Sequence, residues 1–424
     1  MMGWTRLLLN AHIRMGRYSV KVKTLLVLWM LCFIGLWVMY FRYGDPETCS
    51  GEQARTFVCD NYDKGVVAGS MCEELCKQTK VTLDGCLAQD TFHQAFTGTL
   101  KKPPKQRKNI DEPLYIKQLL NPQREGFNKP ASGSSMEDLR IMISANLKRH
   151  LGDAINLDRV QSRILNLADS NNDGKVSLPE ARSIWSLLQA KEFLMMMVLG
   201  ESDYIPRLLG FCGNMYIMEG IHAFRLYGAE FPPFVDFVLP NSAQRFFQRK
   251  IAPPWTDRAH IVVGLLEFVE EIMEGPAGNL YMCHVNEMGI GYTAYSDVKI
   301  LRLDGVLTEQ AVQSSLRDRT CFGDGDCLLG ENCRSPCDKL TGRCTGEMMQ
   351  PNLQRVCHML SAYLLDDSPY EILQELQDLL SKCEDLKFGS KNMNMDHSLV
   401  LNNLKSLLWK QVSHLKKFSK TSRT

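Results

Sequence analysis

The first strong feature of the chain is an apolar run near its beginning. Residues 24–41, with the sequence TLLVLWMLCFIGLWVMYF, contain no charged side chain and are about as long as the shortest helix that crosses a bilayer. Basic residues without a single acid precede this run, at Arg6, Arg14, Arg17, Lys21 and Lys23. The positive-inside rule therefore predicts a membrane anchor at 24–41, a cytosolic tail at 1–23 and a lumenal remainder, the type II orientation. A cleaved signal peptide is the alternative, but its apolar core would end in small residues rather than in WVMYF.

Beyond the anchor, the pattern of apolar positions predicts both strands and helices. Short β-like runs occur at residues 95–100, 113–117 and 207–221. Apolar residues recur at spacings of three and four from Met136 to about Leu199, which is the helical period. Further helices are expected at 259–273, 350–365 and 397–418. Together these elements predict an α+β fold.

Composition and net charge limit the class of protein and the kinds of partner. Of the 424 residues, 45% are apolar and 23% are charged, which is typical of globular proteins. The net charge of +1 creates no overall field that would attract nucleic acid, so no nucleic-acid partner is expected.

All but one of the 15 cysteines follow the anchor. They crowd a cysteine-rich segment at 45–90 and an insert at 321–344, and such density is typical of an oxidising compartment. Zinc is the alternative, but neither group has the CxxC pairs and histidines of a zinc site, so disulfides are favoured. The pairing is left open.

Residues 169–180, DSNNDGKVSLPE, match the pattern of a twelve-residue calcium loop. Gly174 supplies the sharp turn that such a loop needs at its sixth position. The predicted ligands are Asp169, Asn171, Asp173, the backbone carbonyl of Lys175, Ser177 and Glu180. The sequence therefore predicts an EF-hand within about residues 136–190, with a dissociation constant of roughly 10⁻⁵ to 10⁻³ M. An Asx-rich turn that caps the next helix is the alternative.

Three further residues fit a nucleotide site. The string GFCGNMYIMEGI, residues 210–221, is similar to the fourth and fifth strands and hinge of a protein-kinase small lobe, with Glu219 at the hinge. PLYIK then corresponds to the V-A-I-K motif, which makes Lys117 the candidate phosphate-pairing lysine, with Lys129 as the alternative. Glu192 is its candidate partner on a helix.

With these motifs, the strings GSMCEELC, GLLEFVEEI, QPNLQRVC and HSLVLNNLKSLLWK and the cysteine-rich insert resemble the divergent protein kinase domain family of the early secretory pathway, in particular its first subgroup. The resemblance implies a type II, cysteine-rich protein of the endoplasmic reticulum membrane whose C-terminal part is lumenal. It further implies a bilobal protein-kinase-like fold, with a small lobe at 91–230 that contains the EF-hand and a large lobe at 231–424.

The catalytic motifs depart from those of an active kinase. Relatives that resemble this chain carry Asp after MC, where this sequence has His284, and the metal-binding Asn and Asp are replaced by Gly289 and Arg302. Asp304 and Asp297 are the rescue candidates. A cation cannot replace a carboxylate ligand of Mg²⁺. Binding of ATP together with a divalent metal is therefore expected only if the protein holds the metal differently from an ordinary kinase. The glycine-rich loop is also poor, with Gly98 alone.

The helix that leaves the calcium loop contains no breaker between Pro179 and Met197. It is therefore predicted to be one rod on which Glu180 and Glu192 lie about 18 Å apart. Calcium would then fix the helix that presents Glu192 to Lys117. Two functions follow: a lumenal, calcium-binding pseudokinase that binds or scaffolds an unknown protein partner, or a divergent calcium-regulated transferase acting on secretory proteins or glycans.

Overall fold

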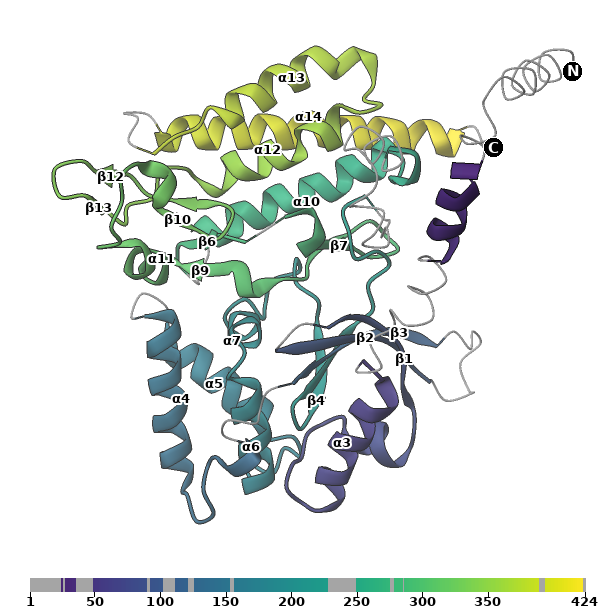
Figure 1. Ribbon diagram of the computed structural model, residues 1–424, viewed down its shortest axis with the longest axis vertical. Coiled ribbons are helices and arrows are strands. Elements are labelled where there is room, and N and C mark those ends of the chain that lie inside the picture. The colour runs from purple at the N-terminus through teal and green to yellow at the C-terminus, as the bar shows by residue number, and fades with distance from the viewer. Residues whose placement is uncertain are drawn as a thin grey trace, which may run out of the picture. The chain divides into compact units, whose positions relative to one another are not determined.

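Figure 1 shows the computed structural model. It describes residues 24–25, 27–35, 49–89, 92–101, 111–120, 126–152, 156–227, 249–274, 278–284, 286–388 and 393–421.

The chain divides into two units, residues 1–50 and 51–424. In the first unit, residues 24–25 and 27–35 are helical and their side chains are exposed. The predicted tail at 1–23 and the end of the predicted anchor at 36–41 lie outside the described residues. No helix within the described residues has both the length and the apolar character that crossing a membrane requires.

A five-stranded sheet forms one side of the second unit. Its order is β1-β2-β3-β5-β4, and every neighbouring pair is antiparallel. The strands are β1 (Val81–Gln89), β2 (His93–Leu100), β3 (Glu112–Leu119), β4 (Leu208–Cys212) and β5 (Met215–Glu219). The three strand regions predicted from the sequence are present. β1 was not predicted: it lies inside the cysteine-rich segment, and bulges between Leu83 and Ala88 interrupt its alternation.

Helices flank this sheet. Two precede β1: α3 (Gly51–Asp63) and the short π-helix η1 (Glu73–Lys77). The predicted helical region between the strands contains η3 (Gly126–Asn128), α4 (Met136–Leu151), α5 (Leu157–Ala168), α6 (Leu178–Leu187) and α7 (Lys191–Val198). α5 packs against α4, α6 and α7.

The predicted continuous rod is broken between α6 and α7. α6 ends at Leu187, and Ala190 adopts an extended backbone (ψ 120°) before α7 begins. Neither residue type breaks helices. Leu188 is fully buried and Ala190 is 7% exposed, so the turn lets two short helices each direct an apolar face into the core. Tertiary packing thus overrides local helix propensity, and the prediction of one rod was wrong.

The rest of the second unit is mainly helical. α10 (Trp255–Glu274) packs against α12 (Asn352–Leu365) and α14 (Met393–Thr421), and α13 (Tyr370–Glu384) contacts both of the latter. Figure 1 shows these four helices gathered on the opposite side of the unit from β1–β4. The smaller elements are β6 (Leu280–Met282), η4 (Glu287–Gly289), β7 (Ile290–Tyr292), β8 (Val298–Ile300), η5 (Leu303–Gly305), β9 (Val306–Thr308) and α11 (Glu309–Leu316).

The cysteine-rich insert contains little regular structure. It consists of η6 (Asp324–Asp326), β10 (Leu328–Leu329), β11 (Cys333–Arg334), β12 (Cys337–Asp338) and β13 (Arg343–Cys344). Because its strands are two residues long, disulfides rather than a sheet must hold it together.

Each cysteine that follows the anchor is disulfide-bonded. The described bridges are Cys59–Cys76, Cys72–Cys212, Cys283–Cys333, Cys321–Cys337, Cys327–Cys344 and Cys357–Cys383. The prediction of disulfides rather than zinc is confirmed. The sulfur atoms of Cys321, Cys327 and Cys344 do converge within 4.8 Å, but bridges already occupy all three.

Candidate functional site

A buried ion pair joins the sheet to the helical region. Lys117, in β3, lies in register with Ala95 of β2 and Tyr216 of β5, and its ammonium group pairs with the carboxylate of Glu192 in α7. The two residues are 6% and 5% exposed. Lys117 Nζ also donates a hydrogen bond to the carbonyl oxygen of Leu301, at 3.1 Å. The structure thus brings the two sequence candidates together, whereas Lys129 is exposed and lies outside this site.

The charge state of this pair follows from its surroundings. Burial acts to lower the pKa of Lys117, but the attraction of Glu192 outweighs it, so the pKa lies well above the usual value. Lys117 is therefore a permanent cation near neutral pH. It also lies 5.3 Å from the centre of the Tyr115 ring, which adds a cation–π contact.

A cleft of about 310 Å³ opens beside the pair. One wall comes from β1, β2 and β3 and includes Ala95, Tyr115 and Lys117. The other wall holds Arg302 and Asp304, whose side chains form an ion pair with 3.2 Å between Nη2 and Oδ2. This is the place where a kinase holds the phosphates of its nucleotide.

The three degraded positions, His284, Gly289 and Arg302, lie at this second wall or close to it. A Cβ atom on Gly289 would lie 3.4 Å from Cβ of Arg302, and one on Gly305 would lie 2.5 Å from Cβ of His284. His284 is exposed, and Asp304 lies between it and the cleft, because it lines the cavities on both sides.

The residues present do not fit a magnesium site. In the part of the chain that the structure describes, no three carboxylate or histidine ligand atoms converge; one cysteine trio is the sole such group. Asp304 is held by Arg302, whose guanidinium would repel a metal ion. Asp297 accepts a hydrogen bond from Thr293 Oγ1 at 3.2 Å and does not line the cleft. Neither rescue candidate completes a site.

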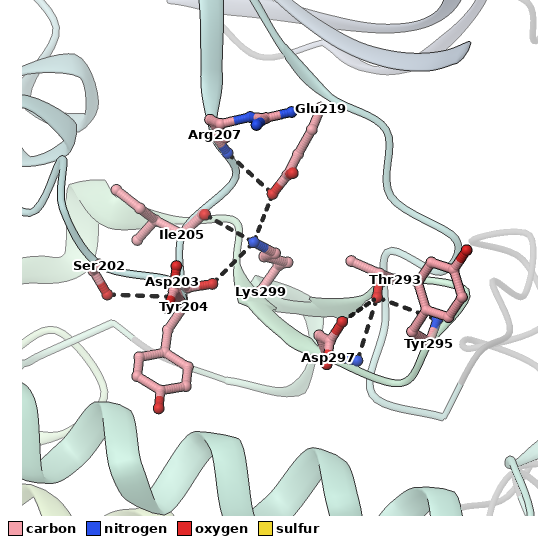
Figure 2. Close-up of polar contacts among 10 residues, drawn as sticks. All are labelled: Ser202, Asp203, Tyr204, Ile205, Arg207, Glu219, Thr293, Tyr295, Asp297 and Lys299. Atoms are coloured by element: carbon pink, nitrogen blue, oxygen red, sulfur yellow. Dashed lines mark hydrogen bonds and ion pairs between the residues drawn. The ribbon is translucent and has the colours of Figure 1, made fainter. Parts of the chain in front are cut away.

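The side chain of Glu219 is turned away from the cleft. Figure 2 shows it beside Lys299, whose ammonium group pairs with Glu219 and also donates to the carbonyl oxygens of Asp203 (2.9 Å) and Ile205 (3.2 Å). Glu219 further accepts a hydrogen bond from the backbone N–H of Arg207 at 3.1 Å. Any contact of Glu219 with a nucleotide would have to come from its backbone.

Lys299 is a site residue that sequence reasoning missed. It lies in β8, two residues before Leu301, so it links the strand that supports the cleft to the end of β5. A lysine between the apolar residues Val298 and Ile300 was the available signal, because a charge within a buried strand needs a partner.

Gly98, the one glycine that the sequence offers for a glycine-rich loop, does not lie in a loop that could cover phosphates. Gly98 is within β2, where a Cβ atom would lie 2.1 Å from the carbonyl oxygen of Thr82, so it allows close approach of β1. The three residues of the sequence between β1 and β2, 90–92, include no glycine. The cleft therefore lacks the flexible glycine-rich cover of a kinase.

The predicted calcium loop joins α5 to α6 with the expected helix–loop–helix order. Asp169 accepts hydrogen bonds from the backbone N–H groups of Asp173 (3.1 Å) and Gly174 (2.9 Å), and Gly174 has a φ of +80°. Asn171, Asp173, Lys175 and Ser177 are exposed on the loop. This folded, oxygen-rich loop fits a calcium ion in its donor set and in its glycine turn.

Glu180, the last predicted ligand, is 3% exposed and is held inside the loop. Its Oε1 atom accepts hydrogen bonds from the backbone N–H (3.0 Å) and the side-chain hydroxyl of Ser170. Its Oε2 atom accepts hydrogen bonds from the backbone N–H (2.8 Å) and the side-chain hydroxyl of Ser177. Burial acts to raise the pKa of Glu180, but these hydrogen bonds outweigh it and lower the pKa below its usual value. The group is an anion, yet it must exchange these partners to complete a calcium site.

The antiparallel sheet, the strand lysine paired with a helix glutamate, and the helical second part together define a protein-kinase-like domain of the α+β class. Two family models match the chain. One, described as "Protein-kinase domain of FAM69", matches residues 184–386, and the other, "N-term cysteine-rich ER, FAM69", matches residues 16–166. The chain belongs to this FAM69 family of divergent kinase-like proteins with a cysteine-rich region, which confirms the resemblance seen in its motifs.

The two matches divide the small sheet between them. Lys117 lies within the range of the cysteine-rich model, whereas Glu192 lies within that of the kinase model. The buried ion pair therefore unites the two parts into one site. The calcium-type loop falls between the two matched ranges.

Proposed function

We propose that this protein is a pseudokinase of the endoplasmic reticulum membrane, with its C-terminal part in the lumen, which acts by binding or scaffolding a lumenal protein. The observation that carries the proposal is the wall of the cleft. The Lys117–Glu192 ion pair of a kinase is present, but Arg302 and His284 occupy the positions at which phosphoryl transfer needs carboxylates. A cation at Arg302 can contact phosphate directly but cannot hold Mg²⁺.

Three observations support the proposed location. The apolar run at 24–41 follows a basic tail, which favours a type II anchor. The disulfides favour an oxidising compartment. The matching family model is described as "N-term cysteine-rich ER". An epitope at each end of the chain, probed by protease protection, tests the orientation: the C-terminal epitope is expected to be protected.

We further propose that calcium regulates the small lobe through α5, rather than through one continuous helix that joins the loop to Glu192. The loop begins at Asp169, the C-cap of α5, and Arg163 of α5 donates hydrogen bonds to the carbonyl oxygens of Met197 and Val198 at the end of α7. Calcium held by the predicted ligands would fix the end of α5, and α5 would in turn hold the helix that carries Glu192. Thermal stability measured with and without calcium tests this: equal shifts for the native protein and Glu180→Gln would remove the idea.

A divergent transferase acting on secretory proteins or glycans is the second candidate. It is favoured by the intact Lys117–Glu192 pair, because a buried ion pair is costly to maintain without a use. Titration calorimetry of ATP with Mg²⁺, Mn²⁺ and Ca²⁺, followed by assay for turnover, separates the two. The pseudokinase proposal predicts no transfer and no metal enhancement of binding, whereas turnover that is lost in Lys117→Met would establish the enzyme.

A further inference from the structure

A second cavity, of about 350 Å³, lies on the other side of Asp304 from the nucleotide cleft. Five separate segments form it: the end of α4, the start of α7, His284, residues 304–315 with β9 and α11, and Leu329 of β10. Its position places it next to the residue that replaces the catalytic base, on the side where a kinase would receive its acceptor.

Positive charge is concentrated in this cavity. Lys148, Arg149 and His150 come from α4, Lys191 from α7, and His284 follows β6. Among the described residues that line it, Asp304 is the sole acid, and Arg302 already neutralises that carboxylate. Arg149 and Lys191 therefore give the cavity two positive charges that no other carboxylate among its described lining residues balances.

Helix stability does not account for all of this charge. Basic residues in the last turn of α4 complement the helix dipole, as they do in many helices. Lys191 does the opposite, because it is the first residue of α7, where the dipole disfavours a cation. Burial, together with repulsion from Lys191 and Arg149, lowers the pKa of His150, and all three residues line the same cavity.

Polar side chains line the walls beside apolar ones such as Leu194 and Leu307. Gly152, with a φ of +75°, lies against Gln310 at the start of α11: a Cβ atom would lie 2.1 Å from Oε1 of that side chain, so the end of α4 contacts α11. Ser315 Oγ donates to the carbonyl oxygen of Ala311 at 2.7 Å, so its lone pairs remain available to a ligand's hydroxyl groups. Such a surface suits a small, polar, anionic ligand better than an apolar one.

We propose that this cavity binds a phosphate or sulfate monoester carried by a polar molecule such as a sugar. The ester dianion lies between Arg149 and Lys191, and the hydroxylated carrier contacts the start of α11. Arg149 can bind two ester oxygens at once, and Lys191 supplies a point charge from the opposite wall. The protein then recognises an acidic modification next to its nucleotide cleft. This binding does not depend on the proposed pseudokinase function, since neither nucleotide nor metal takes part.

Titration of the full-length protein with glucose 6-phosphate, glucose 6-sulfate and glucose, in the absence of nucleotide and metal, tests the proposal. Both esters, or one of the two, are expected to bind, and glucose is not. Binding of the phosphate alone assigns the cavity to phosphorylated ligands, and binding of the sulfate alone to sulfated ones. Absence of binding by both esters would overturn the proposal.

Matched variants locate the binding. Lys191→Gln and Arg149→Gln each remove one exposed cation of the cavity and are expected to weaken ester binding about three- to tenfold. Arg140→Gln removes the same charge from an exposed position of α4 outside the cavity and is expected to leave binding unchanged. Equal weakening by all three variants would show a general charge effect and contradict the site.

Discussion

Replacement of Glu192 by glutamine tests the buried ion pair most sharply. The variant keeps the shape of the side chain but leaves the ammonium group of Lys117 without a counter-charge in a site that is 6% exposed, although the carbonyl oxygen of Leu301 still accepts its hydrogen bond. Removing one partner of a buried pair typically costs about 3–5 kcal/mol. The loss has an upper limit, because Lys117 can release its proton instead, and deprotonating an ordinary lysine at pH 7 costs about 5 kcal/mol.

The assay is thermal unfolding under oxidising conditions. For a unit the size of residues 51–424, a loss of 4 kcal/mol lowers the midpoint by about 5 °C. The double variant Lys117→Met with Glu192→Leu removes both charges and is expected to recover most of the loss, since apolar replacements of buried pairs are often neutral. Glu201→Gln is the control, because Glu201 pairs with Arg159 and Arg163 on the surface, and its midpoint should not move. A double variant as unstable as Glu192→Gln would refute the electrostatic explanation.

Three further predictions concern other parts of the molecule. Lys299→Met leaves Glu219 without its cation and two carbonyl groups without their donor, so denaturant unfolding should show a loss of about 2–4 kcal/mol. Folding lowers the pKa of Glu180 from its ordinary value of 4.5, so the Glu180 carboxylate stabilises the fold fully above pH 4.5, and this stabilisation is lost as the pH falls through the lower pKa of the folded state. Between pH 6 and pH 3, the free energy of unfolding should therefore decline less steeply for Glu180→Gln than for the native protein. Replacing Cys283 and Cys333 together by serine opens a large loop beside His284 and should cost about 4 kcal/mol in the same unfolding assay, whereas an unchanged midpoint would contradict this.

Local motifs predicted much of the small lobe. Lys117, Glu192 and the strand that ends at Glu219 were all placed on the correct elements, because short motifs there encode both secondary structure and position. The choice of disulfides over zinc followed from the density and spacing of the cysteines and from the lack of histidines among them. What these signals share is that each depends on residues close together in sequence.

The predictions that failed depend on tertiary contacts. No residue type marks the break before α7; it exists because Leu188 and Ala190 are buried between neighbouring elements. The direction of the Glu219 side chain is set by Lys299, which is far away in sequence. A motif places a residue on a strand but does not reveal which distant group it meets.

α13 was missed although its signal was present. Ile372, Leu376, Leu379 and Leu380 recur at spacings of three and four, and all are buried against the neighbouring helices. The amphipathic period alone would have been enough to predict this helix. β1 gave a weaker signal, because its bulges break the alternation on which strand prediction relies.

In the proposed pseudokinase, the guanidinium group of Arg302 would contact the phosphates of a nucleotide directly, in place of a metal ion. Titration calorimetry of ATP onto the full-length protein, with Mg²⁺ or with a chelator, tests this role when the native protein is compared with Arg302→Asp. We expect the affinity of the native protein for ATP to be the same or lower with Mg²⁺, and we expect ATP binding by Arg302→Asp to depend on the metal. Tighter binding of ATP by the native protein in the presence of Mg²⁺ would contradict it.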